Sequence, residues 1–101
     1  MAGRPKDRKA QIVRAAARAF SERGYHGVGV DEIAAEVGIS GPALYRHFAN
    51  KYALLVATAE YTVAVLVAAA RVADDPDRPA DERLRAVTDA LIETSIGKRG
   101  E

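Results

Sequence analysis

The sequence predicts an all-α protein, in which a three-helix bundle is followed by two further helices. Apolar residues recur three and four positions apart along most of the chain, which is the spacing of amphipathic helices. Alanine, the residue with the highest helix propensity, is abundant. The alternating run at residues 27–30 is short and lies between helical patterns, so no strand is expected.

Capping residues divide the chain into five expected helices. Gly24 and Gly38 end the first two, because the residue that follows a helix often has a left-handed backbone. Ser40 and Asn50 start the third and fourth, since their side chains accept hydrogen bonds from the free N–H groups of a first turn. The expected helices are 7–23, 30–37, 41–48, 51–73 and a fifth that begins near residue 79.

Apolar stripes predict which side of each helix is buried. The stripe of the first helix consists of Ile12, Val13, Ala16, Ala17 and Phe20. The stripe of the fifth helix consists of Leu84, Val87, Leu91 and Ile92. The fourth helix is apolar nearly all round between Tyr61 and Ala70, more surface than one neighbouring helix can cover. We therefore expect self-association through the fourth and fifth helices.

The two halves of the chain carry opposite charge. Residues 1–51 contain nine Lys and Arg against five Asp and Glu, a net of +4, and residues 52–101 contain six against nine, a net of −3. This asymmetry is typical of a protein whose one end meets a polyanion, although ordinary surface charge explains it equally well. We expect a DNA-binding domain with a basic arm at 1–50 and a truncated helical regulatory or dimerisation segment at 51–101.

Residues 30–48 combine the features of a helix-turn-helix. Two short helices are joined by a turn at 38–40, where Gly38 supplies the positive φ. Ala34 is small where the second helix crosses, and Leu44 fills the space between the two helices. The spacing is typical of the homeodomain-like motif whose second helix enters the major groove, although a plain helical hairpin can also show it.

Over residues 8–56 the chain resembles the TetR family of bacterial transcriptional regulators. The matching residues are Gly24-Tyr25, Val30-Asp31-Glu32-Ile33-Ala34, Gly38-Ile39-Ser40, Leu44-Tyr45-Arg46-His47-Phe48 and Lys51. The resemblance implies a homodimer, in most cases a repressor, that binds a palindromic operator. It also implies a small-molecule effector bound by the C-terminal helical domain of a full-length relative rather than by this short chain.

Two departures from the family pattern bear on how DNA is read. Gly29 stands where Thr or Ser is usual, so a hydroxyl that can reach phosphate is missing. The third helix opens with Gly41, Pro42 and Ala43, positions that often carry polar base-reading side chains. Direct readout must then rest on fewer residues.

The expected DNA contacts lie on the third helix, at the start of the fourth, and in the arm. Arg46 is the leading candidate for base readout, since a guanidinium pairs with guanine O6 and N7, and a phosphate contact is its alternative. Pro42 and Ala43 either pack on thymine methyl groups or simply open the helix. The family pattern implies backbone contacts for Tyr45 and His47. The full predicted set is Ser40, Gly41, Pro42, Ala43, Tyr45, Arg46, His47, Lys51, Arg4 and Lys6.

Lys51 and the N-terminal arm carry separate arguments. An ammonium in the first turn of a helix opposes the helix dipole at a cost of about 0.3–1 kcal/mol, and a docked phosphate reverses that sign. Lys51 is therefore expected to bind phosphate.

Arg4 and Lys6, with Arg8 and Lys9, form a basic arm that lies along the DNA backbone or in a minor groove. A solvated tail is the equal alternative.

Other functions are not supported by the pattern. The chain has no Cys, which rules out disulfides and thiolate metal sites. The acids at 74–82 lack the glycine and register of a calcium loop, and no catalytic arrangement can be argued from spacing. The apolar run 52–70 approaches the length of a membrane span, but it contains Glu60, so a buried helix is expected. No enzyme activity, metal or cofactor is expected, and the location is cytoplasmic, at the nucleoid.

The expected function is sequence-specific DNA binding and transcriptional regulation, as a repressor. The alternative is a helical interaction module that pairs with a full-length relative through the fourth and fifth helices. Such a module would act as a dominant-negative partner without binding DNA itself.

Overall fold

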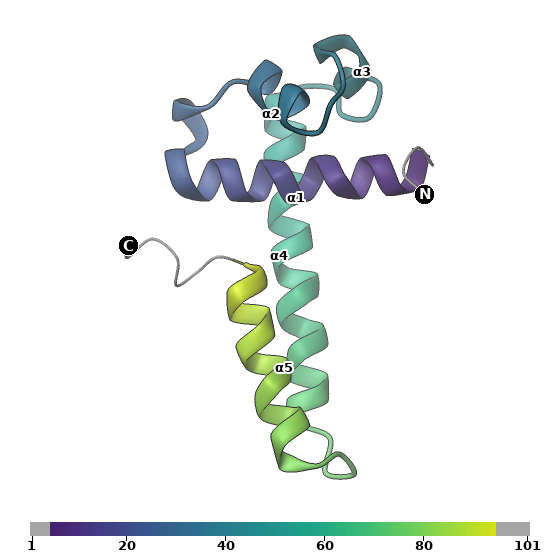
Figure 1. Cartoon of the computed structure of the whole chain (residues 1–101), viewed down its shortest axis with the longest axis vertical. Coiled ribbons are helices and arrows are strands. Elements are labelled where there is room, and N and C mark those ends of the chain that lie inside the picture. Colours follow the sequence, from purple (N-terminus) through teal and green to yellow (C-terminus); the bar gives the residue numbers. More distant parts are fainter. Residues whose placement is uncertain (1–4, 95–101) are drawn as a thin grey trace. The chain divides into compact units, whose positions relative to one another are not determined.

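The structure, a computed structural model, describes residues 5–94, with side chains from Arg8 onward. Within that range it contains helices and turns and no strand, so the all-α prediction is confirmed. The elements are α1 (Pro5–Arg23), the 3-10 helix η1 (Tyr25–Gly27), α2 (Val30–Glu36), α3 (Gly41–Tyr45), α4 (Lys51–Ala73) and α5 (Ala80–Glu93) (Figure 1).

The chain divides into two units, Met1–Ala59 and Glu60–Glu101. The first unit holds α1, α2, α3 and the first turns of α4, and the second holds the remainder of α4 with α5. The sequence-based boundary lies at residue 50, whereas the structure groups the start of α4 with the helix-turn-helix. One continuous helix therefore contributes to both units.

Each α-helix of the first unit contributes one large, fully buried aliphatic side chain to the core. These side chains are Ile12 of α1, Ile33 of α2, Leu44 of α3 and Leu54 of α4. Burying a side chain of this size contributes about 1.5–3 kcal/mol. The first turns of α4 are thus part of what holds the helix-turn-helix together.

The buried face of α1 is broader than the predicted stripe. The helix begins at Pro5, two residues earlier than predicted, which suits proline because its missing N–H costs nothing in a first turn. Ala17 is half-buried, whereas Ala15 and Ala19, outside the predicted stripe, are 1% and 2% exposed. The face is broad because both α2 and η1 lie against this helix.

The regular part of α3 is shorter than predicted and ends at Tyr45 rather than at residue 48. The N–H groups of Arg46 and His47 donate to the carbonyls three residues earlier, at 3.2 and 2.9 Å. This is the tighter pattern of a 3-10 turn. The tightened turn still buries Phe48, which is 6% exposed.

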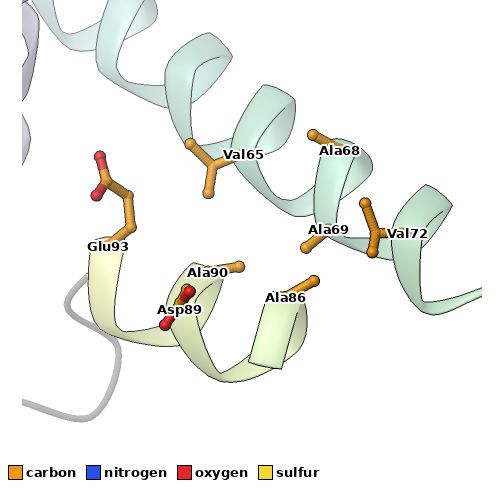
Figure 2. Close-up of a pocket in the computed structure, with 8 residues that line it drawn as sticks. All are labelled: Val65, Ala68, Ala69, Val72, Ala86, Asp89, Ala90 and Glu93. Atoms are coloured by element: carbon orange, nitrogen blue, oxygen red, sulfur yellow. The ribbon is translucent and has the colours of Figure 1, made fainter. Parts of the chain in front are cut away.

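In the second unit, α5 turns its small side chains toward α4. Short apolar side chains of both helices, with Asp89 and Glu93, line a pocket of about 380 Å³ between them. Figure 2 shows Val65, Ala69 and Val72 of α4 pointing toward α5. Ala90 is the buried residue of α5, at 5% exposure.

The predicted stripe of α5 is therefore wrong as a buried face. Leu84, Val87, Leu91 and Ile92 are 69%, 38%, 45% and 66% exposed. At about 100° per residue, Leu84, Leu91 and Ile92 lie on the side of the helix opposite to the alanines that face α4. Val87 lies beside that face and lines a second pocket together with Val67 of α4. The helix is amphipathic as predicted, but three of its four large apolar side chains point away from its neighbour.

Within residues 5–94, α4 is the helix that is long and apolar enough to cross a membrane by length and composition. The mean hydropathy of its most apolar window is 1.9, and 17% of that window is buried. The prediction of a helix buried inside a helical domain is thus met only at its start, where Leu54 and Thr58 are buried. Val63 and Val67, further along, are 58% and 44% exposed.

Candidate nucleic-acid interface

Backbone hydrogen bonds hold the turn between α2 and α3. The N–H groups of Gly38 and Ile39 donate to the carbonyls of Ala35 and Ala34, each at 3.0 Å. Gly38 has a φ of 79°, in the left-handed region that costs other residues roughly 1–2 kcal/mol. Ala34 is 1% exposed, as expected where two helices cross. The turn and the small residue beneath it agree with the sequence-based interpretation.

The start of α3 is fixed by its cap. The hydroxyl of Ser40 accepts a hydrogen bond from the N–H of Ala43 at 3.2 Å, and Pro42 occupies the first turn. Leu44, 1% exposed, anchors the opposite side. Because the Ser40 cap and the buried Leu44 both make contacts within the chain, they fix the rotation of α3 about its own axis in the free protein.

The remaining side chains of this segment form its outer surface. Pro42, Tyr45 and Arg46 are exposed, Tyr45 by 47%, and Ala43 and His47 are half-buried. The surface offers one guanidinium, one phenol and one imidazole beside two small apolar residues. It suits a partner that presents both hydrogen-bond acceptors and methyl groups, as the major groove does.

Gly41, at the start of α3, leaves room for a side chain of α2. A β-carbon added at Gly41 would lie 2.5 Å from Oδ1 of Asp31. Asp31 itself is favourable in the first turn of α2, where the helix dipole is positive. The carboxylate therefore occupies the space that a side chain at position 41 would need. The sequence shows that position 41 has no side chain, but it does not show that the Asp31 carboxylate fills the space.

Lys51 is the first residue of α4, and it is half-buried. Its Nζ lies 4.5 Å from the centre of the Tyr25 ring, within cation–π range. The predicted cap is present beside it, since Oδ1 of Asn50 accepts from the N–H of Ala53 at 2.7 Å. Residues 25 and 51 carry no sequence pattern that pairs them, so only the fold could show this contact.

Half of the predicted basic arm is engaged inside the first unit. Nη1 of Arg8 donates to the carbonyl of Val37 at 3.2 Å, which satisfies a free carbonyl at the end of α2. Nζ of Lys9 lies 5.6 Å from the centre of the Phe48 ring. Arg4 lies outside the described residues, and Lys6 lies in α1 with its side chain outside the description.

The buried core, the capped turn and the exposed outer side of α3 define a helix-turn-helix domain of the kind found in bacterial DNA-binding regulators. Residues 12–58 match the family described as bacterial regulatory proteins, tetR family. This match, over less than half of the chain, confirms the resemblance that the sequence shows to that family. Its members are DNA-binding regulators and not enzymes.

Two curated relatives extend the comparison. The chain is 40% identical over 90 residues, 88% of its length, to the HTH-type transcriptional activator FasR of Mycolicibacterium smegmatis (strain ATCC 700084 / mc(2)155). It is 39% identical over 57 residues, 56% of its length, to YerO of Bacillus subtilis (strain 168), an uncharacterized HTH-type transcriptional regulator. The matches span 41% and 20% of these relatives, so the chain corresponds to less than half of either protein.

Proposed function

We propose that this chain binds double-stranded DNA in a sequence-specific manner through α3 and regulates transcription. The observation that carries the proposal is the outer surface of α3, where Tyr45 and Arg46 are exposed while Ser40 and Leu44 fix the helix from within. A short helix fixed in this way can enter the major groove with its outward side chains against base edges.

The proposed contacts fall into two classes. Arg46 reads a base edge, because it is exposed at the end of α3 and has the fork geometry that matches guanine. Lys51, Tyr45 and His47 contact phosphates and set the register of the domain on the duplex. Pro42 presents an apolar surface for a thymine methyl group. Ser40, Gly41, Ala43, Arg4 and Lys6 complete the proposed interface.

The proposed site is a palindromic operator bound by a homodimer. A two-fold symmetric protein places its two reading helices on half-sites about one helical turn apart. Repression is the proposed outcome, since an operator that overlaps a promoter blocks polymerase. The relative FasR is named an activator, so a reporter with the operator upstream or downstream of the promoter is needed to decide between the two outcomes.

Selection of the unmodified chain against a pool of randomised duplexes tests the proposal. We expect an inverted repeat to be enriched, and we expect its affinity to fall with salt as phosphate contacts release counterions. Enrichment of single half-sites would contradict the dimer but not the reading surface. Absence of binding at low salt would contradict the proposed function.

Two substitutions separate the two classes of contact. Arg46→Ala should cost about 1–3 kcal/mol and relax preference at one base pair. Lys51→Ala should weaken all sequences alike and reduce the salt slope by about one unit. Arg85→Ala, which removes an exposed cation of α5, is the matched control and should change neither. An equal loss on every sequence from Arg46→Ala would move Arg46 to the phosphate class.

The exposed face of α5 favours a second candidate function, a helical interaction module. Leu84 and Ile92, 69% and 66% exposed, lie on a face that nothing covers within residues 5–94, and such patches mark protein contacts. The partner would be a second copy or a full-length relative. Sedimentation of the unmodified chain and of a Leu84→Ser, Ile92→Ser variant tests this. A monomer at micromolar concentration in both would contradict it.

The remaining proposals concern effector and location. The pocket between α4 and α5 is apolar apart from Asp89 and Glu93, and it is open in the described part of the chain. We propose that an effector is bound by a longer relative in which further helices close such a pocket, and not by this chain alone.

We also propose that this chain acts in the cytoplasm at the nucleoid, where a DNA-binding regulator meets its operator. Fluorescence microscopy of a tagged chain would test this location.

A further inference from the structure

Tyr25 and Lys51 meet across the first unit although they are far apart in the sequence. Tyr25 belongs to η1, directly after α1, and Lys51 is the first residue of α4. The Nζ of Lys51 lies 4.5 Å from the centre of the Tyr25 ring, which is close for a cation–π contact. Both residues are half-buried, so the contact is only partly screened by water.

The ring beneath the ammonium is itself held in place. The centre of the Phe20 ring lies 5.6 Å from that of Tyr25, and the His26 ring meets it edge-on at 5.1 Å with an interplanar angle of 82°. Phe20 is 9% exposed, which ties this stack to the core. Contacts with two other rings therefore restrain the Tyr25 ring that Lys51 touches.

The contact between Lys51 and Tyr25 also offsets an unfavourable electrostatic interaction at the start of α4. The N-terminus of a helix is positive and repels an ammonium in its first turn. Without another interaction, the long side chain of Lys51 would extend into solvent. The negative face of an aromatic ring attracts a cation, so Tyr25 keeps the ammonium close to the helix end in spite of the dipole.

We propose that Tyr25 is a positioning residue for DNA binding, whose ring holds the Lys51 ammonium where a backbone phosphate docks at the start of α4. The proposal rests on the proposed DNA-binding function. An ammonium has three N–H donors, so the side facing away from the ring stays available to phosphate oxygens. A side chain that is already restrained loses less freedom on binding, and the phosphate contact is therefore stronger with the ring than without it.

Two substitutions at position 25 separate positioning from packing. Tyr25→Phe keeps the ring face, and Tyr25→Leu keeps apolar bulk without a face. We expect Tyr25→Leu to weaken binding by about two- to fivefold, the loss of a weak cation–π contact expressed as affinity, and to do so on all sequences alike. Tyr25→Phe should bind as the unmodified chain does. In a Lys51→Ala background, Tyr25→Leu should cause no further loss.

Proton NMR of the free protein gives a readout that needs no DNA. The ε-methylene protons of Lys51 should be shifted upfield by the ring in the unmodified chain and in Tyr25→Phe, and should return to ordinary values in Tyr25→Leu. Thermal melting confirms that each variant is folded. If Tyr25→Leu does not melt cooperatively, Tyr25→Met replaces it, since methionine fills irregular gaps.

Three results would overturn the positioning role alone. The first is the absence of an upfield shift in the folded, unmodified chain while DNA binding is intact, which leaves the proposed function standing. The second is tighter DNA binding by Tyr25→Leu, which would mean that the ring withholds Lys51 from phosphate. The third is an equal loss from Tyr25→Leu with and without Lys51. If the shift is present but the unmodified chain binds no duplex, the proposed function fails and the positioning role fails with it.

Discussion

Replacing Gly29 by serine should stabilise the first unit by completing the cap of α2. The structure shows half of a reciprocal cap, in which the N–H of Gly29 donates to Oε1 of Glu32 at 3.3 Å. Glycine has no side chain to return the bond. Gly29 has φ −97° and ψ 156°, a conformation that every residue adopts, and a β-carbon there would meet nothing within 4 Å. The substitution therefore adds a hydroxyl acceptor without strain.

Two known effects bound the size of the gain. Replacing glycine where any residue fits stabilises by about 0.4–1 kcal/mol, and serine exceeds glycine at an N-cap by a few tenths of a kcal/mol. Because both values include the freedom of glycine in the unfolded chain, they are not added, and the expected gain is about 0.3–1 kcal/mol, a rise in Tm of about 1–8 °C for a domain of this size. Thermal melting followed by circular dichroism at 222 nm measures it.

Gly24→Ser is the matched control for this prediction. Gly24 has φ 81° and ψ 160°, a region that only glycine occupies readily, so the same serine should destabilise by about 1–3 kcal/mol. A lower or unchanged Tm for Gly29→Ser would refute the capping argument. A rise for both variants would show that the backbone conformations of the two glycines do not determine the effect.

The other predictions concern the buried residue Leu54, the Asn50 cap of α4 and the exposed surface of α5. Leu54→Ala should cost about 2–5 kcal/mol in urea unfolding because Leu54 has no exposure, and a loss under about 1 kcal/mol would mean that α4 does not belong to the first core. Asn50→Ala should cost about 0.5–2 kcal/mol through the lost bond to Ala53, while Asn50→Asp should retain most of it. Ile92→Ser should change the free energy of unfolding of the isolated chain by no more than about 0.5 kcal/mol, since Ile92 is 66% exposed, and a larger loss would show that its face is covered.

The local signals in the sequence are enough to predict most of the first unit. Gly24 and Gly38 have the positive φ expected of helix-ending glycines, and Ser40 and Asn50 accept the expected N–H bonds. These features depend on a few adjacent residues, so they can be seen without the fold. The end of α3 differs from the prediction because the chain tightens into a 3-10 turn after Tyr45, which the local sequence pattern does not show.

Contacts between distant residues could not be predicted. Arg8 and Lys9 have the sequence pattern of a DNA-binding arm, yet Arg8 bonds to the carbonyl of Val37 and Lys9 lies over Phe48. The buried face of α5 is predicted from its large apolar residues, as is usual for a helix that packs on a core. The prediction fails because periodicity shows that a helix has an apolar side but does not show which neighbour meets that side.

The close approach of Asp31 to Gly41 bears on how the proposed reading surface of α3 can change. Position 41 lies at the start of this helix, and Asp31 occupies the space that an added β-carbon would need. Because Oδ1 ends an exposed and rotatable side chain, a residue at position 41 is accommodated once the Asp31 carboxylate turns away, and substitutions at two positions in such contact need not be additive. A mutational library that varies residues 31 and 41 together would show whether a change of preference at this point needs both.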